Sequence, residues 1–352
     1  MTRARLRDLG ITIGSFPPGP ENAITDVPGV WVGHRTLIQD VPPSAVRTGV
    51  TVVTAREGHL GEDLPFAGYF SFNGCGEMTG VAWIEESGLL ASPIALTNTA
   101  QVGMVRDAIS QYARGRYYWL PVAAETYDGW LNDMSAQALT REDVFAALDA
   151  AAPGPVAEGN VGGGTGMICH DFKGGIGTSS RSVTADFGQF TVGALVQANY
   201  GDRELLRVDG VPVGREIGPE VVPMPWQAPP ASSSILVVLA TDAPLLPVQC
   251  KRLARRATVG LARAGGTGHA FSGDLFLAFS TGNHCSPMAR APLEVHMFPL
   301  AGMDPLFDAA AEAVEEAILN ALTAAETMVG REGHQAYALP LDELQRIMAK
   351  YR

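Results

Sequence analysis

Short apolar segments rich in β-branched residues recur along the chain and predict buried strands. The clearest are 50–54, 190–197, 235–241, 275–280 and 293–298. Each is only five to eight residues long, which is typical of a strand and too short for most helices.

Segments with apolar residues every three or four positions predict helices between and after these strands. They are 99–113, 140–151, 244–263, 305–329 and 341–350. Thr140 is followed three positions later by Asp143, which resembles a capping box at the start of the second helix. Pro244 and Pro247 are tolerable in the first turn of the third.

The segment 305–329 has the strongest helical pattern. Asp304 is the expected N-cap, Pro305 fits the first helical position, and Gly330 is the expected stop. Its apolar stripe consists of Leu306, Ala310, Val314, Ile318, Leu322 and Ala325. Long helices that flank strand pairs predict a layered α/β protein, with the strand order left open.

One segment interrupts this alternation. Residues 221–234 read VVPMPWQAPPASSS, and a predicted strand follows at once. Because proline cannot pair inside a central strand, we expect a loop or an edge here.

Length and charge restrict the possible functions. A chain of 352 residues with 46% apolar residues is long enough for one large domain or two smaller ones. Its net charge of −12 argues against nucleic acid as a partner, because phosphate backbones are repelled. The basic cluster 251–256 is better interpreted as the solvated face of a helix than as a nucleic-acid site.

The cysteines and the N-terminus predict a cytoplasmic protein. The four cysteines form no close pair, so we expect reduced thiols rather than a disulfide framework or a zinc site. The basic N-terminal stretch is not followed by the apolar core of a signal peptide. No apolar run is long enough to span a membrane, so no membrane partner is expected.

A glycine-rich segment, 159–181, holds eight glycines in 23 residues. It matches neither the P-loop pattern nor a dinucleotide-binding fingerprint. We therefore favour close backbone packing and tight turns over phosphate binding.

The usual hydrolase motifs are missing. HExxH is absent, which removes the support for metal catalysis, and so is the GxSxG of an α/β-hydrolase. A serine without a histidine partner is still a nucleophile if self-cleavage makes it the new N-terminus, because its free α-amine then moves protons near neutral pH. Ser234 lies at a suitable loop-to-strand junction, although an ordinary serine-rich loop fits the same residues.

Several long motifs resemble the DmpA-type family of L-aminopeptidase/D-amino-acid esterase-amidases, which includes the β-peptidyl aminopeptidases. They occur in the same order over nearly the whole chain. They are NAITDVPGVWVGH (22–34), FNGCGEMTG (72–80), AETYDGWLND (124–133), GNVGGGTGM…FKGGIGTSSR (159–181), TVGALVQANYG (191–201), SILVVLATDAPL (234–245), FSGDLFLAFSTGN (271–283) and AILNALTAAETMVGR (317–331).

The resemblance implies a single domain over 1–352 with an αββα four-layer sandwich. This fold resembles the N-terminal-nucleophile hydrolases but differs in connectivity. The resemblance further implies self-cleavage into an α chain, 1–233, and a β chain, 234–352. It implies hydrolysis of small peptides, amino-acid amides or esters without a cofactor, by a homo-oligomer of αβ units.

The family's site residues map onto this chain one by one. Ser234 matches the nucleophile, and Ser272 with Asp274 matches the pair that orients the nucleophile and its amine. Asn199 matches the asparagine that stabilises the oxyanion, and Tyr127 matches a tyrosine of the same site. Glu125 is a further candidate, for pairing with the free amine of the substrate.

One position departs from the family pattern. The residue before the cleaved bond is usually Gly or Asn in the family, but here it is Ser233, within the run 232–234. The sequence therefore leaves the cleaved bond undecided by one or two positions within this run. The position of the following ILVV segment relative to the family motif favours cleavage before Ser234.

Two other functions stay open at this level. One is an acyltransferase similar to the ornithine acetyltransferases, although those use a threonine nucleophile. The other is a non-catalytic scaffold with the same fold. The sequence does not choose between α- and β-amino acids, L and D forms, or amides and esters.

Overall fold

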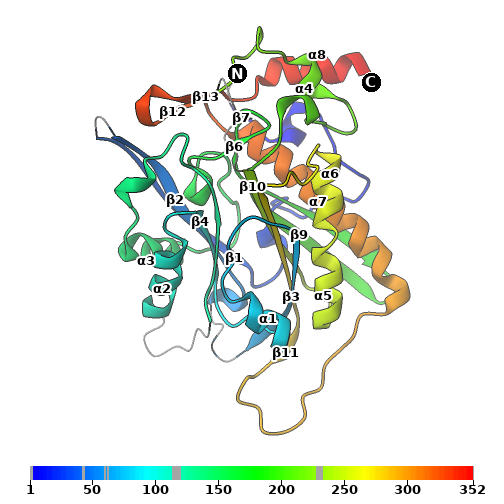
Figure 1. Ribbon diagram of the computed structural model, residues 1–352. Helices are drawn as coiled ribbons and strands as arrows, with labels where there is room; N and C mark the ends of the chain where they lie inside the picture. Colours follow the sequence, from blue (N-terminus) through cyan, green and yellow to red (C-terminus); the bar gives the residue numbers. More distant parts are fainter. Residues whose placement is uncertain are drawn as a thin grey trace.

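A computed structural model describes residues 3–41, 44–58, 61, 63–112, 120–226 and 233–351. Two sheets lie face to face at the centre of the molecule (Figure 1). The smaller sheet has the strand order β1-β2-β4-β5. Its strands are β1 (Trp31–Val41), β2 (Ser44–Thr54), β4 (Ile94–Asn98) and β5 (Val122–Thr126).

The larger sheet has the strand order β3-β11-β10-β9-β8. Its strands are β3 (Leu64–Gly74), β8 (Gly175–Ala185), β9 (Gly188–Asn199), β10 (Ser233–Thr241) and β11 (Ser272–Cys285). Strands β10 and β11 run parallel to each other, and the other neighbours are antiparallel. Strand β10 is thus the centre of this sheet.

Helices cover the outer face of each sheet. Helices α5 (Pro247–Ala254), α6 (Ala257–Arg263) and α7 (Met303–Ala324) lie on the larger sheet. Helices α2 (Val102–Tyr112) and α3 (Arg141–Asp149) lie on the smaller one. The predicted αββα sandwich is confirmed.

Several further helices and strands lie outside the four layers. They are α1 (Val81–Ser87), α4 (Val213–Glu216), α8 (Leu341–Tyr351), the strand pair β6 (Ile168–Cys169) and β7 (Phe172–Lys173), and the strand pair β12 (Met328–Val329) and β13 (Gln335–Ala336).

The uninterrupted apolar sequence of β10 follows from its position. Side chains alternate between the two faces of a strand. Ile235 and Val237 pack into the cluster beneath the helices, and Leu236 and Val238 pack into the cluster between the sheets. A strand that is buried on both faces favours apolar side chains, and the polar residues Ser233, Ser234 and Thr241 lie at the two ends of β10.

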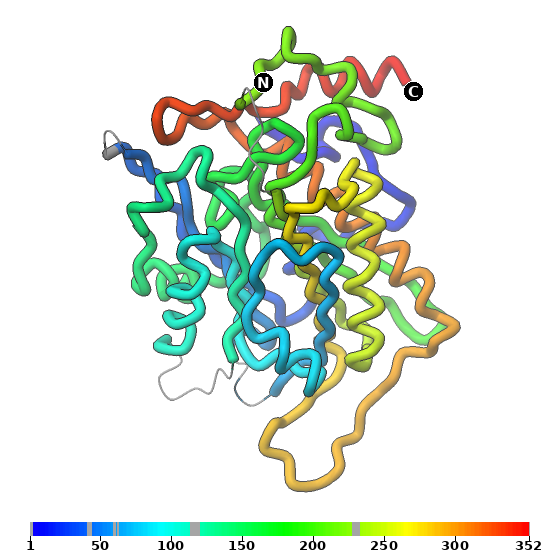
Figure 2. Tube along the Cα trace, in the orientation of Figure 1, coloured from blue at the N-terminus to red at the C-terminus, as the bar shows by residue number. Residues whose placement is uncertain are grey.

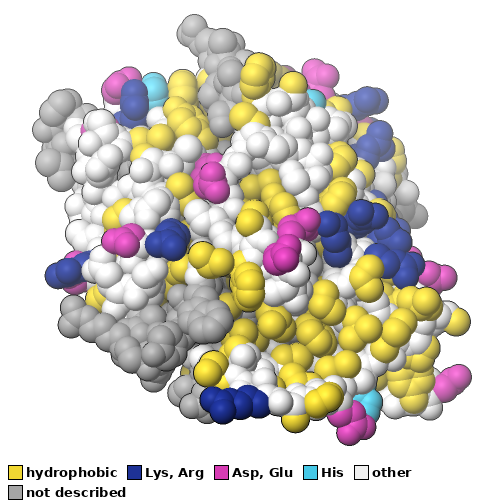
Figure 3. All heavy atoms as spheres, turned by 60° about the horizontal axis from the view of Figure 1, so that its bottom comes forward, with side chains coloured by type: hydrophobic (Ala, Val, Ile, Leu, Met, Phe, Trp, Pro, Cys, Tyr) yellow, Lys and Arg dark blue, Asp and Glu magenta, His cyan; other side chains and the backbone are white. Residues whose placement is uncertain are grey.

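Four of the five predicted strands are confirmed, and the fifth is wrong. Residues 293–298 form no strand and belong to a segment that projects from the molecule between β11 and α7 (Figure 2). Leu293, Val295 and Met297 are exposed, so their apolar alternation does not reflect burial against a sheet. Hydrophobic side chains are prominent on this end of the molecule in Figure 3.

The predicted helix 244–263 is two helices. The chain breaks at Arg255 and Arg256, between α5 and α6, and Pro247 occupies the start of α5. The basic cluster is also less solvated than expected. The guanidinium groups of Arg252 and Arg256 lie over the ring of Phe307, which covers the apolar surface of α7.

Helix α7 begins earlier and ends earlier than predicted. It begins at Met303 after Gly302, so Asp304 lies in its first turn instead of capping it. It ends at Ala324, and β12 then pairs with β13 before Gly330 can act as a stop. Among the described helices, none is both long and apolar enough to cross a membrane.

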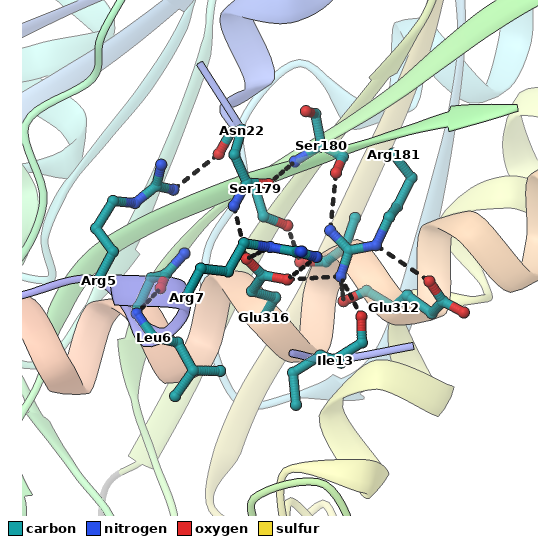
Figure 4. A network of polar contacts seen from close by, with 12 residues as sticks. Arg5, Leu6, Arg7, Ile13, Asn22, Ser179, Ser180, Arg181, Glu312 and Glu316 are labelled. Carbon is teal, nitrogen blue, oxygen red and sulfur yellow. Dashed lines mark hydrogen bonds and ion pairs between the residues drawn. The ribbon is translucent and has the colours of Figure 1, made fainter. Parts of the chain in front are cut away.

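A buried ion network fixes the N-terminal segment against α7 (Figure 4). Arg181 of β8 is fully buried, and its guanidinium lies 3.1 Å from Glu312 Oε2 and 2.7 Å from Glu316 Oε2. Arg7 adds a contact of 2.8 Å to Glu316, and the Asn22 amide donates to the same carboxylate at 2.6 Å. Charged and polar side chains therefore link α7, β8 and the N-terminal segment in one network.

The carboxylate of Glu316 is ionised because its partners outweigh its burial. Burial alone would raise the pKa of Glu316, but the hydrogen bond from Arg7 and the charge of Arg181 together lower it. Its contribution to stability is therefore present above the ordinary carboxyl pKa and is lost as the pH falls through the lowered value.

Substituting Arg181→Met should strongly destabilise the protein, because Glu312 and Glu316 would lose their fully buried cation. We expect a loss of about 3–5 kcal/mol in the free energy of unfolding, measured by urea denaturation. The matched control is Arg141→Met, which removes an exposed pair with Glu142 and should leave the unfolding midpoint unchanged. Equal losses in both variants would contradict this account.

Candidate active site

Strand pairing brings the predicted catalytic residues together. Ser234 lies near the start of β10, opposite Asn199 on β9 and Gly273 on β11. Ser272 and Asp274 flank Gly273 on the same strand. Because paired positions on neighbouring strands lie about 5 Å apart, residues distant in sequence meet here without any loop having to place them.

The hydroxyl of Ser234 faces the peptide bond that precedes it. Its Oγ donates to the Ser233 carbonyl oxygen at 2.5 Å and accepts from the Gly273 N–H at 3.1 Å. Ser234 is nearly fully buried, and Ser233 and Ser234 both belong to β10. The nucleophile candidate is thus held beside a carbonyl group of its own chain.

Ser272 and Asp274 form a hydrogen-bonded pair on the other face of the sheet. The Ser272 hydroxyl donates to Asp274 Oδ1 at 2.6 Å, and the Ser233 hydroxyl donates to Ser272 Oγ at 3.0 Å. Burial raises the pKa of Asp274, against the hydrogen bond from Ser272. Asp274 Oδ2 is buried and has no hydrogen-bond partner among the described residues, so it can accept a further donor.

The side-chain amide of Asn199 is held at both ends. Its Oδ1 accepts from the Ile168 N–H at 2.9 Å, and its Nδ2 donates to the Tyr127 carbonyl oxygen at 3.0 Å. An amide nitrogen carries two hydrogens, so one donor stays available toward the cavity that Asn199 lines.

A cavity of about 230 Å³ opens beside this amide. Its wall contains the aromatic residues Tyr127, Trp130, Trp226 and Phe271. Trp130 packs edge-on against Trp226 and stacks on the His334 ring at 3.8 Å, so these rings support one another. The cavity is suited to a small, partly apolar ligand.

Three aromatic residues of the cavity wall were not predicted from the sequence: Trp130, Trp226 and Phe271. Trp130 stands within the motif 124–133, Phe271 begins the motif 271–283, and Trp226 lies in the proline-rich segment. Nothing in the sequence indicates that these three segments meet, because they are far apart along the chain and come together only in the folded structure.

Glu125 of β5 is separated by Gly76 from Gly273, the strand partner of Ser234, and it is not among the residues that line the cavity. Its Oε1 accepts from the Glu77 N–H at 2.9 Å, and its Oε2 accepts from the Thr99 hydroxyl. A Cβ placed on Gly76 would come within 3.3 Å of Glu125 Oε1 and 3.2 Å of the Gly273 Cα. Gly76 therefore lies between Glu125 and Gly273 and leaves little space for a larger residue. Glu125 is almost fully buried and has no ion-pair partner in the described part of the chain.

The glycine-rich segment packs closely against its neighbours, as predicted. A Cβ on Gly163 would lie 2.1 Å from Gln197 Oε1, and one on Gly164 would lie 2.4 Å from the Ile176 nitrogen. The segment continues to Ile168, whose N–H donates to Asn199 Oδ1. Its close packing therefore positions this donor. Within the described residues, no group of three or more His, Cys, Asp or Glu side chains is arranged to hold a metal ion.

Comparison with known proteins identifies the family. The sequence profile of peptidase family S58 matches residues 22–336. The chain belongs to this peptidase family. Among curated S58-like relatives, the β-peptidyl aminopeptidase BapA of Sphingosinicella xenopeptidilytica is 46% identical over 98% of this chain and 90% of its own length.

Solved structures agree with the S58 assignment over the whole fold. A β-aminopeptidase from Burkholderia sp. superimposes with a TM-score of 0.92 and 52% identity, covering 99% of both chains. The L-aminopeptidase D-Ala-esterase/amidase of Ochrobactrum anthropi superimposes with a TM-score of 0.90 and 43% identity, covering 99% of this chain and 98% of its own. The latter is described as a variant of the Ntn-hydrolase fold.

Substituting Gly273→Ala should impair peptidase turnover, because the new Cβ would lie 2.6 Å from the Cys75 carbonyl oxygen and 2.9 Å from the Gly76 Cα. The backbone must shift, and the N–H that holds Ser234 Oγ shifts with it. We expect kcat to fall by about tenfold or more. The control Gly103→Ala, on an exposed turn of α2 with open space around it, should keep full activity. Normal kcat in Gly273→Ala would contradict the role of this N–H.

Proposed function

We propose that this S58 member is a self-processing aminopeptidase whose nucleophile is Ser234. The observation that carries the proposal is the position of Ser234 Oγ, which touches the carbonyl group of Ser233 and is held by the Gly273 N–H. Asn199 lies directly opposite on β9. A nucleophile, a scissile carbonyl and an amide donor thus occupy adjacent positions.

The first reaction is the cleavage of the chain itself. Ser234 Oγ attacks the carbonyl carbon of Ser233, the C–N bond breaks, and the nitrogen takes up the hydroxyl proton and becomes the α-amine of Ser234. Water then hydrolyses the resulting ester and leaves a carboxylate on Ser233. The products are the chains 1–233 and 234–352.

The new α-amine would meet the pair formed by Ser272 and Asp274. Ser272 is the register partner of Ser233, directly beside the bond to be cut. The free Asp274 Oδ2 is an acceptor for a cationic amine or for a donor oriented by it. This pair holds the amine where it can take the proton of the Ser234 hydroxyl.

Substrate hydrolysis then repeats the same chemistry on an external carbonyl. Ser234 Oγ attacks the substrate carbonyl, the amine or alcohol leaves with a proton, and water releases the acyl group. The free N–H of Asn199 Nδ2 stabilises the negative charge that develops on the carbonyl oxygen. Tyr127 contributes its backbone carbonyl to hold Asn199 and its side chain to the cavity wall.

Glu125 is proposed to pair with the free ammonium of the substrate. It is a buried carboxylate with two hydrogen-bond donors but no cation, and burial without a counter-charge is costly. A substrate ammonium would supply that charge. An enzyme that requires this contact acts on N-terminal residues and spares interior peptide bonds.

The substrates are proposed to be small peptides, amino-acid amides and esters. The related proteins are named for β-peptidyl aminopeptidase activity and for L-aminopeptidase with D-Ala-esterase/amidase activity. The cavity of about 230 Å³ accommodates one amino-acid side chain and its backbone. Assembly of αβ units into a homo-oligomer and a cytoplasmic location stay predictions.

Substituting Ser234→Ala should leave a single chain without activity, because both the cleavage and the turnover use the same hydroxyl. Gel electrophoresis and intact-mass spectrometry report the cleavage, and aminoacyl-p-nitroanilides report the turnover. The matched control is Ser233→Ala, which keeps the nucleophile and should still give two chains of about two-thirds and one-third of the length. A cleaved or active Ser234→Ala protein would refute the proposal.

Substituting Glu125→Gln should reduce kcat/KM for substrates with a free amine by about tenfold or more, because it removes a charge-assisted contact. Substrates with an acetylated amine should be turned over at the same low rate by both proteins. The control Glu142→Gln changes an exposed carboxylate and should affect neither substrate class. An equal loss for both classes would assign Glu125 a structural role only.

A further inference from the structure

Lys173 is a buried cation that the proposed reaction does not use. It lies in β7 and is fully buried. Its ammonium donates to three carbonyl oxygens, those of Gly164 at 3.2 Å, Met167 at 2.9 Å and Gly174 at 2.8 Å. All three ammonium hydrogens therefore have acceptors, and no carboxylate pairs with Lys173 within the described residues.

The Met167 carbonyl connects this ammonium to the site. The same peptide unit that presents the Met167 oxygen to Lys173 presents the Ile168 N–H to Asn199 Oδ1 at 2.9 Å. A donor at the oxygen of a peptide unit withdraws electron density and makes its N–H a stronger donor. The lysine charge thus acts on the Asn199 amide through a single peptide group.

Asn199 is the next link in this chain. Its Oδ1 accepts the polarised N–H, and its Nδ2 keeps one donor for the cavity. Since hydrogen bonds in series strengthen one another, the cation makes this last N–H more acidic and fixes its direction.

We propose that Lys173 is a positioning residue for the oxyanion donor Asn199, acting through the Met167–Ile168 peptide unit. The proposal rests on the proposed function, because it assumes that Asn199 stabilises the oxyanion. The structural alternative is that Lys173 only holds the glycine-rich segment together. A neutral side chain could do that without the cost of burying a charge.

The electrostatic surroundings of Lys173 are consistent with a group sensitive to pH. Burial lowers the pKa of Lys173 to about 7. A thiolate at Cys169 would raise the pKa of Lys173, but burial raises the pKa of that thiol to about 12. The thiol is therefore neutral at the pH where Lys173 loses its proton.

The decisive experiment is a double-mutant cycle with Lys173→Met and Asn199→Ala in the complete protein. Asn199→Ala alone should lower kcat by about 10²–10³. Lys173→Met alone should lower kcat by about 10–100-fold with little change in KM. In the double variant, Lys173→Met should add less than about threefold, because the residue through which it acts is gone. Independent, multiplying losses would overturn the proposal.

Two further variants separate positioning from folding. Thr165→Ala removes a buried hydrogen bond to Gly162 within the same segment without touching the Met167–Ile168 unit, and it should keep kcat within about threefold. If Lys173→Met does not fold, Lys173→Gln keeps N–H donors for the carbonyls without the charge. A fully active Lys173→Gln protein would overturn the role of the charge.

The pH profile gives a readout that a structural role would not change. As the pH rises through the pKa of Lys173, the ammonium loses its charge, so wild-type kcat should fall on the alkaline side. Lys173→Met should lack this fall, and a fall that persists in it would overturn the proposal. If the alkaline fall persists in Lys173→Met, only the role of Lys173 is overturned, and an inactive, uncleaved Ser234→Ala protein still supports the proposed function. An active Ser234→Ala protein would overturn the proposed function itself.

Discussion

The pairing of β10 between β9 and β11 is the constraint on which the site depends. It places Ser234 opposite Asn199 on one side and Gly273 on the other. The apolar residues of β10 are buried on both faces, so the strand cannot slip by one position without moving its whole apolar set to the wrong side. Hydrophobic burial thus fixes the register, and the register fixes the distance between Ser234 and Asn199, the proposed nucleophile and oxyanion donor.

Two buried polar systems support that strand from outside the site. The network of Arg181, Glu312 and Glu316 ties the edge strand β8 to α7 and to the N-terminal segment. Lys173 ties the glycine-rich segment to the peptide that holds Asn199. Each contains charges that are costly to bury, and each is paired or fully hydrogen-bonded. The two systems differ in their distance from the proposed catalytic residues: the first lies far from them, and the second is two hydrogen bonds from Asn199.

Much of the fold could be predicted because short apolar segments rich in β-branched residues favour a buried strand over other structures. The segments around 50–54, 190–197, 235–241 and 275–280 are all strands, but 293–298, in which apolar and polar residues alternate, is largely exposed and forms no strand. Helix ends were less predictable, since α7 ends at Ala324, before the pairing of β12 with β13 begins at Met328. The candidate catalytic residues came from a family resemblance, and peptidase family S58 matches residues 22–336 of the chain. Lys173 and the cavity tryptophans could not be found this way, because their roles arise from contacts between distant segments.

The central claim is that the hydroxyl of Ser234 carries the acyl group during turnover. The most direct measurement is to mix the protein with an aminoacyl ester, stop the reaction with acid, and map the adduct by mass spectrometry. The account predicts the acyl group on the first residue of a chain that begins at Ser234. An adduct on another residue, or turnover by an uncut chain that carries no adduct, would contradict it.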